Sequence, residues 1–123
     1  MLEAYSIGVS VAADSVVPFN SVSIEKGCTA KLASPTSIEL NKCGVYMVAV
    51  DAVASAATTL QLTKDGIAQP QAQATGTNPS FTTLVQVPTN NSCCACASPV
   101  TLQVANSDAV ALTNANIVVT KLC

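Results

Sequence analysis

The chain of 123 residues is half hydrophobic, yet only 3% of it is aromatic and 10% is charged. It contains no His, Trp or Arg, so the commonest general base and the commonest nitrogen ligand of zinc are missing. A formal charge of −2, with five lysines scattered singly along the sequence, gives no electrostatic footprint for nucleic acid. So few charges on a Val-rich surface suggest that a partner covers part of it.

The N-terminal segment 1–16 carries Glu3 and Asp14 and lacks the basic start of a signal peptide. No stretch of the chain approaches the ~18 uninterrupted apolar residues of a membrane span. We therefore expect a single domain over 1–123, made in the cytoplasm and not inserted into a membrane. Residues 1–16 would form an N-terminal arm or a first strand, and 17–122 the body of the fold.

Strand signals follow one another from Phe19 onward, with turn residues between them. After "FNSVSIEK" and "TAKLA", the expected strands are 36–40, 45–54, 58–63, 67–74, 80–87, 99–105 and 115–122. The segment 45–54 is apolar on both faces and should be the most buried strand. A competing helix over 49–57 is disfavoured because its valines, and the threonines that follow, prefer strands.

Turn residues support the same interpretation. Asp65-Gly66 predicts a tight hairpin because both residues readily adopt positive φ, and Pro70 marks an edge or bulged strand. Residues 109–112, "AVAL", are expected to belong to a connection before the last strand. Short strands at roughly 8–12-residue spacing are typical of an all-β fold. We expect a jelly-roll β-sandwich of about eight to ten strands.

The order of motifs resembles a known family. The most specific element is I-x-L-x-x-x-G-V-Y-x-V, which is formed by Ile38, Leu40, Gly44, Val45, Tyr46 and Val48. The Asp65-Gly66 hairpin and the approach to the last strand, with Asn106 and Leu112, fit the same pattern. Over residues 17–122 the chain is similar to the trimeric jelly-roll family of tumour necrosis factor and the complement globular head. It is closest in style to bacterial spore-surface and phage fibre or head-decoration members.

This resemblance implies a homotrimer. Candidate side chains for the trimer core are Phe19, Tyr46, Val48, Phe81 and Leu84. The family is usually rich in aromatic residues along the threefold axis, and this chain is not. Trimer packing would then depend on Val, Leu, Ile and Met.

The six cysteines are distributed unevenly, and three of them lie in the loop "NNSCCACASP". Loops between consecutive antiparallel strands alternate between the two ends of a sandwich. By this parity Cys43, Cys93, Cys94, Cys96 and Cys123 should lie at one end. Cys28 shares that end only if 29–33 is a separate strand.

Three chemical states of the cysteine cluster remain open. Disulfides could link Cys43 or Cys123 to members of 93–96, and adjacent cysteines usually take separate partners. A four-thiolate zinc or iron–sulfur site has enough ligands but lacks the usual paired C-x-x-C spacing. Free thiols suit a protein made in the cytosol. We therefore name no metal ligand and no cofactor, and treat the five cysteines as disulfide candidates.

No catalytic constellation is visible in the sequence. A nucleophilic cysteine needs a nearby base or positive field, and only Lys42 and Lys121 lie close to a clustered cysteine. The carboxylates show neither a glycosidase pair nor a calcium loop. Asp51 is unusual because it lies inside the most apolar strand; it could satisfy a hydroxyl group or mark a strand end. We expect no enzymatic activity and no catalytic residue.

Two classes of function compete. The first is a non-enzymatic structural protein of a phage virion, a trimer that decorates the head or forms a fibre head, with capsid or fibre protein as its partner. The second is a trimeric knob that binds a receptor or glycan through loops at the cysteine-rich end. Tyr5, Tyr46, Phe19 and Phe81 look too few and too core-like for a glycan platform, which disfavours the knob. A bacterial spore or cell-surface protein is a third possibility.

Overall fold

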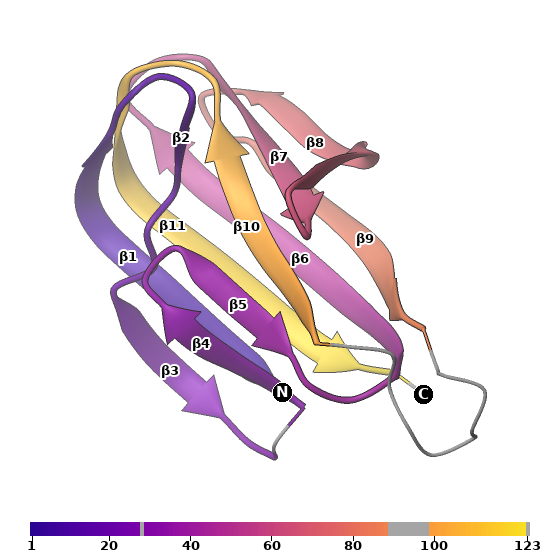
Figure 1. Cartoon of the computed structure of the whole chain (residues 1–123). Coiled ribbons are helices and arrows are strands. Elements are labelled where there is room, and N and C mark those ends of the chain that lie inside the picture. Colours follow the sequence, from indigo (N-terminus) through magenta and orange to yellow (C-terminus); the bar gives the residue numbers. More distant parts are fainter. Residues whose placement is uncertain (28, 89–98, 123) are drawn as a thin grey trace.

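The computed structural model describes residues 1–27, 29–88 and 99–122. These residues form eleven strands in two antiparallel sheets, which pack face to face as a sandwich (Figure 1). None of the described residues forms a helix, so the strand interpretation of 49–57 is confirmed. The all-β jelly-roll architecture expected from the strand spacing is also confirmed.

Sheet A has five strands in the order β3-β1-β11-β6-β9. Their bounds are β3 Ser21–Glu25, β1 Leu2–Val11, β11 Val110–Lys121, β6 Gly44–Ala54 and β9 Ser80–Val87. The N-terminal residues thus form an internal strand of sheet A. β1 pairs with β11 from Leu2 to Val11 and with β3 over Leu2–Tyr5.

Sheet B contains the other six strands, in the order β4-β5-β10-β7-β8, with the two-residue strand β2 paired to β10. Their bounds are β4 Ala30–Ser34, β5 Ser37–Leu40, β10 Val100–Asn106, β7 Thr58–Lys64, β8 Ile67–Gly76 and β2 Ser15–Val16. β8 is an edge strand, as the proline at position 70 indicates, because proline cannot donate a ladder hydrogen bond.

The core lies between the two sheets and follows from the two-residue period of the strands. Along β6 the inward side chains Tyr46 and Val48 are fully buried, and so is Ile117 on β11, which pairs with Val50 of β6. Sheet B supplies Leu62 and Leu102 from the opposite side. The core is therefore mainly aliphatic, as the composition requires.

Two polar clusters fix the ends of the sandwich. At one end the buried Tyr46 hydroxyl donates to the carbonyl oxygens of Lys42, at 2.6 Å, and Thr29, at 3.2 Å. At the other end the buried Asn106 side chain accepts a hydrogen bond from the Thr58 hydroxyl and donates to the carbonyl of Ala12. The Asn106 side chain also donates to the Asp108 carbonyl. Buried polar groups satisfied in this way stabilise the connections that they cross-link.

The structure confirms the hairpin at Asp65-Gly66, where the φ angles are 52° and 82°. Two expectations were wrong. Residues 109–112 are not simply a connection, because β11 runs without interruption from Val110 and absorbs an irregularity between Leu112 and Asn114. The segment 45–54 is not buried on both faces, since Asp51 and Val53 on its outer side are exposed.

Candidate functional site

The outer face of sheet A combines polar and apolar side chains. These side chains alternate with the buried ones along four strands: Glu3, Tyr5 and Ile7 on β1; Asn114, Asn116 and Val118 on β11; Met47, Ala49, Asp51 and Val53 on β6; Ser80, Thr82 and Leu84 on β9. We call this set the A face. Its most exposed aliphatic side chains are Ile7, at 73%, and Leu84, at 58%.

The strand register arranges the A face in rows. Asp51 pairs with Ser80 on one side and with Asn116 on the other, and Asn116 pairs with Tyr5. A polar row therefore crosses four strands of sheet A. Apolar side chains flank this row, with Val53 and Ile7 toward one end and Met47 and Leu84 toward the other.

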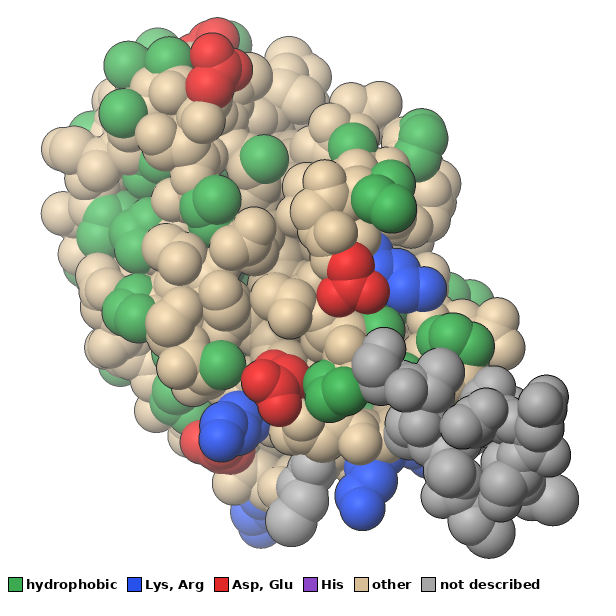
Figure 2. Space-filling view, viewed as in Figure 1, with side chains coloured by type: hydrophobic (Ala, Val, Ile, Leu, Met, Phe, Trp, Pro, Cys, Tyr) green, Lys and Arg blue, Asp and Glu red, His purple; other side chains and the backbone are tan. Residues whose placement is uncertain are grey.

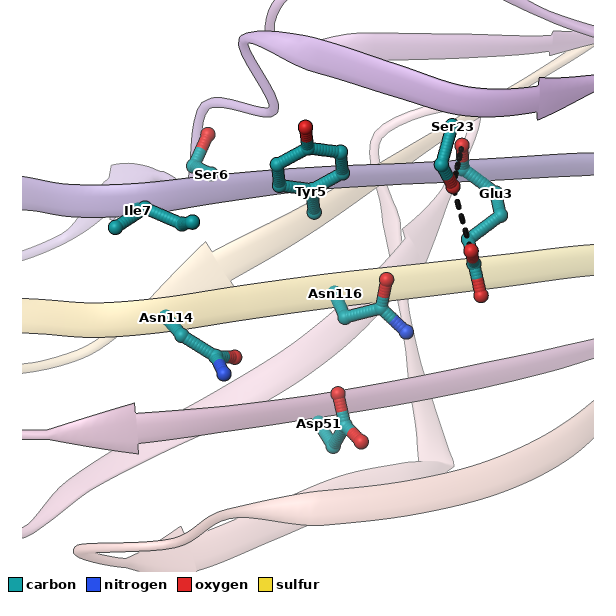
Figure 3. Close-up of a pocket in the computed structure, with 8 residues that line it drawn as sticks. All are labelled: Glu3, Tyr5, Ser6, Ile7, Ser23, Asp51, Asn114 and Asn116. Atoms are coloured by element: carbon teal, nitrogen blue, oxygen red, sulfur yellow. Dashed lines mark hydrogen bonds between the residues drawn. The ribbon is translucent and has the colours of Figure 1, made fainter.

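Asp51 lies at the centre of this row. A hollow of about 420 Å³ is lined by Asp51, Asn114, Asn116, Tyr5, Ile7, Ser6, Glu3 and Ser23 (Figure 3). Two adjoining hollows on the same face also include Asp51. The A face is thus shallowly concave around Asp51, with Glu3 as a second carboxylate in the first hollow.

The polar side chains of the row have no partner within the described chain. Tyr5, Asp51, Asn114 and Asn116 make no hydrogen bond or ion pair with another described residue. In Figure 3 the Asp51 and Asn116 side chains extend from neighbouring strands, and the dashed lines run only between Ser23 and Glu3. In contrast to Asn106, these groups are left to solvent or to another molecule.

The outer face of sheet B is chemically different. Its outward side chains are mostly threonine and glutamine: Thr59, Gln61 and Thr63 on β7, and Thr101 and Gln103 on β10. We call this set the B face. Of the eight large hydrophobic side chains exposed in the described part of the chain, five lie on sheet A strands (Ile7, Val22, Ile24, Val53 and Leu84) and two adjoin them (Met1 and Leu122). Only Ile67 among these eight lies on sheet B.

The five trimer-core candidates do not share one surface. Phe19, Tyr46 and Val48 are buried inside the sandwich, so their side chains are not available to a second copy of the chain. Their assignment as subunit contacts was wrong. Alternation of apolar residues along a strand shows which side is buried, but not whether the other sheet or another subunit covers that side. Phe81 is half-buried against the core, and Leu84 lies on the A face.

The cysteine-rich end can be located from the described residues around it. Val87 pairs with Gly44, Val100 pairs with Leu40, and the Leu122 amide donates to the Val45 carbonyl at 2.7 Å. The Asn41 amide likewise donates to the Thr29 carbonyl at 2.9 Å. The immediate neighbours of Cys28, of segment 89–98 and of Cys123 therefore surround the turn that contains Cys43. We call this end the cysteine pole.

Only Cys43 among the six cysteines is described, and it forms no disulfide with a described residue. It is half-buried against the core. Cys28, Cys93, Cys94, Cys96 and Cys123 lie outside the described residues, as do the linkages expected for them. Within the described part of the chain, no three His, Cys, Asp or Glu side chains form a group that could hold a metal.

The lysines, which the sequence scatters singly, gather at the cysteine pole in space. Lys26, Lys31, Lys42, Lys64 and Lys121 all lie at or beside strand ends at this pole. Figure 2 shows lysine side chains along the lower edge of the molecule, toward that end, with acidic side chains among them. The opposite end carries Asp14 and Asp108 and no lysine among the described residues. No helix of the described residues has the length and apolar character to cross a bilayer.

No family model matches the chain, and no curated protein matches it by sequence. Among solved structures, the chain is similar to the globular domain of the zebrafish complement 1qA protein. The TM-score is 0.73 at 8% identity, over 99% of this chain and 96% of that chain. A CBM35 structure from Paenibacillus barcinonensis gives a TM-score of 0.41 at 16% identity, over 98% and 93% of the two chains. The first likeness establishes a jelly roll of the complement globular-head type, and the second is too weak to establish a shared fold.

Sequence reasoning singled out Asp51 and Leu84 but missed the surface that they share. Tyr5 was interpreted as core-like, whereas it lies half-exposed in the polar row. One signal was present in the sequence: Met47, Ala49, Asp51 and Val53 share a parity opposite to that of the aromatic Tyr46. An acidic residue in one parity class of an apolar strand marks that class as the outer one.

Proposed function

We propose that the protein is a non-enzymatic structural protein that assembles as a homotrimer through the A face. The observation that carries this proposal is the unequal distribution of exposed aliphatic side chains, which gather on sheet A and are nearly absent from sheet B. These side chains lie on both sides of the polar row, and their concentration on one sheet marks that sheet as a candidate contact surface. Identical chains usually cover such a surface by assembling with closed symmetry, and the family resemblance selects three copies.

The fold is compatible with this role. The globular domain of the zebrafish complement 1qA protein has the same architecture, and the family resemblance of the motifs implies three subunits. The side chains that line the hollow of the A face are amides, hydroxyl groups, one isoleucine and two carboxylates, and the described residues contain no group of three His, Cys, Asp or Glu that could hold a metal. We place the trimer in a phage virion, on the head or at the head of a fibre, where it would bind capsid or fibre protein.

The alternative functions use the same fold. A trimeric knob would bind a receptor or glycan at the cysteine pole, and a bacterial spore or cell-surface protein would use the trimer as a coat component. The five lysines lie at the cysteine pole together with Glu25, Glu39 and Asp65, so the knob would offer a polar end of mixed charge to its ligand. The neighbouring genes would distinguish these settings, since capsid or portal genes favour decoration and tail genes favour a receptor knob.

A charge placed on the A face tests the assembly. Leu84→Asp puts a carboxylate in the middle of the proposed contact, and Ala33→Asp adds the same charge at an exposed position of sheet B. We expect the wild type and Ala33→Asp to have three times the 12.4 kDa mass of the chain by light scattering. Leu84→Asp should have the mass of one chain at micromolar concentration. A wild type of 12.4 kDa at every concentration contradicts the proposal.

The cysteines remain disulfide candidates at the cysteine pole. Linkage of Cys43 or Cys123 to the 93–96 cluster would reinforce that end by about 2–4 kcal/mol in the unfolding free energy. Intact mass measured with and without reductant, together with metal analysis, tests this. Six free thiols without metal would exclude both a disulfide and a thiolate metal site.

A further inference from the structure

Asp51 is an unexpected residue at the centre of the A face. It is exposed, it makes no hydrogen bond or ion pair with another described residue, and it contributes to three adjoining hollows of this face. Its partners across the sheet are uncharged, since Asp51 pairs with Asn116 of β11 and with Ser80 of β9. None of the side chains labelled around it in Figure 3 is a cation. Asp51 therefore carries a negative charge that its own chain does not compensate.

The other titratable groups that face Asp51 do not supply a positive charge. Glu3 and Tyr5, both on β1, line the first hollow together with Asp51, and Glu3 accepts a hydrogen bond from the Ser23 hydroxyl at 2.5 Å. β9, β11 and the connection before β9 add no titratable side chain to the three hollows. The lysines all lie at the cysteine pole and none of them lines a hollow of the A face. A cation can therefore reach Asp51 only from another molecule.

Assembly through the A face transfers Asp51 from water into an interface between copies. An exposed aspartate is charged at neutral pH. Desolvation without a neighbouring cation disfavours the carboxylate and favours the protonated carboxyl group. One trimer contains three copies of this group, so the preference of each chain is multiplied in the equilibrium constant of assembly. Formation of the trimer should therefore take up protons.

We infer that Asp51 makes assembly through the A face sensitive to pH, so that mildly acidic solution stabilises the trimer and neutral or alkaline solution weakens it. The sign follows from proton linkage. Because the assembled state binds more protons than the free chains, the equilibrium constant of assembly increases as the pH falls. The increase ends below the pH at which the exposed carboxylate of the free chain is itself protonated. Glu3 contributes with the same sign. This inference rests on the proposed assembly through the A face.

The inference is tested by sedimentation velocity of the wild type and of Asp51→Asn at about pH 7.5 and about pH 5.5. Both values lie above the sequence isoelectric point of about 4.7, so the chains keep a net negative charge. We expect the concentration at which half of the wild type is assembled to be about tenfold lower at the acidic pH. Asp51→Asn should assemble more tightly than the wild type at the higher pH. It should also lose most of the dependence on pH.

Glu39→Gln is the matched control, because it removes the same charge from β5 of sheet B. This variant should keep the full dependence on pH. Repulsion between the net charges of whole chains would be relieved equally by both substitutions, and high salt would screen it. Proton uptake by a desolvated group should persist at high salt. Equal dependence on pH in Asp51→Asn and Glu39→Gln would overturn the role of Asp51.

The outcomes separate this inference from the proposed assembly. A wild-type trimer that dissociates equally at both pH values overturns the inference and leaves the trimer in place. A trimer that weakens in acid also overturns it, since a cation of the neighbouring copy would then pair with Asp51. A chain that is monomeric at the higher pH and trimeric at the lower pH supports both proposals. Monomers at both pH values overturn both.

Discussion

The two outer faces of the sandwich are built from the same kind of strand and yet differ in chemistry. The B face carries threonine and glutamine, and its polar side chains contact one another, as Gln103 contacts Ser37 and Thr59 contacts Thr75. The A face carries exposed Ile7, Val53 and Leu84 around a polar row without partners. In our proposal, a second copy of the chain covers the A face and the B face stays in contact with water.

The largest effect is expected on the free energy of unfolding, from substitutions on the inner faces of the sandwich. On these faces the two sheets should contribute equally to stability. Ile117 on sheet A and Leu102 on sheet B are both fully buried. Truncation of either to Ala should lower the free energy of unfolding by about 2–5 kcal/mol, because each leaves a cavity in an aliphatic core. Urea denaturation in the Leu84→Asp background measures this without a contribution from subunit dissociation. A neutral truncation on one sheet would mean that the core does not depend on both sheets equally.

A second pair of variants compares a satisfied asparagine with an unpartnered one. Asn106→Ala removes a buried side chain that joins Thr58, Ala12 and Asp108, and should cost about 1–3 kcal/mol in unfolding free energy. Asn116→Ala, on the A face, should change the unfolding free energy of the monomer by no more than about 0.5 kcal/mol.

The same two variants should have the opposite order of effect on the stability of the trimer. Asn116→Ala should weaken the trimer, whereas Asn106→Ala should leave the subunit contact unchanged at temperatures where the chain is folded. Denaturation and sedimentation equilibrium on both variants provide the two readouts. If the two variants had equal effects on the unfolding free energy and equal effects on trimer dissociation, the proposed difference between a buried asparagine and an A-face asparagine would be wrong.

The smallest expected effect comes from an isosteric exchange between the faces. Val53→Thr makes the A face more like the B face, and Thr63→Val does the reverse on sheet B. Val53→Thr should raise the dissociation constant of the assembly about threefold to tenfold, since it exchanges a covered methyl group for a hydroxyl. Thr63→Val should not change it. A larger effect from Thr63→Val than from Val53→Thr would mean that the subunit contact lies on sheet B and not on sheet A.

Much of the fold is predictable from the sequence because local signals agree with the global arrangement. The Asp65-Gly66 turn, the edge strand with Pro70 and the alternating strands β5, β7 and β9 all follow from residue type and period. Parity also predicts which end of the sandwich receives the turn at Cys43. The described neighbours of the other cysteines lie at that end.

The functional surface is not predictable in the same way. In β6 both parities are largely apolar, and Asp51 alone marks the side that contains Met47 as the outer one. The row of Tyr5, Asn116 and Asp51 joins residues from the first, last and middle thirds of the chain. It exists only through the register of three strands. The gathering of the lysines at the cysteine pole cannot be predicted from the sequence either, because it also depends on how distant strands pair.

The two methionines provide the most direct test of the central claim that a second copy covers the A face. Met47 lies on that face, and Met1 lies at the exposed start of β1. Their rates of oxidation by peroxide are compared by mass spectrometry at protein concentrations above and below the dissociation midpoint. We predict that Met47 is oxidised several-fold more slowly in the assembled protein, while the rate for Met1 is unchanged. Equal rates for Met47 in the assembled and dissociated protein would contradict the account.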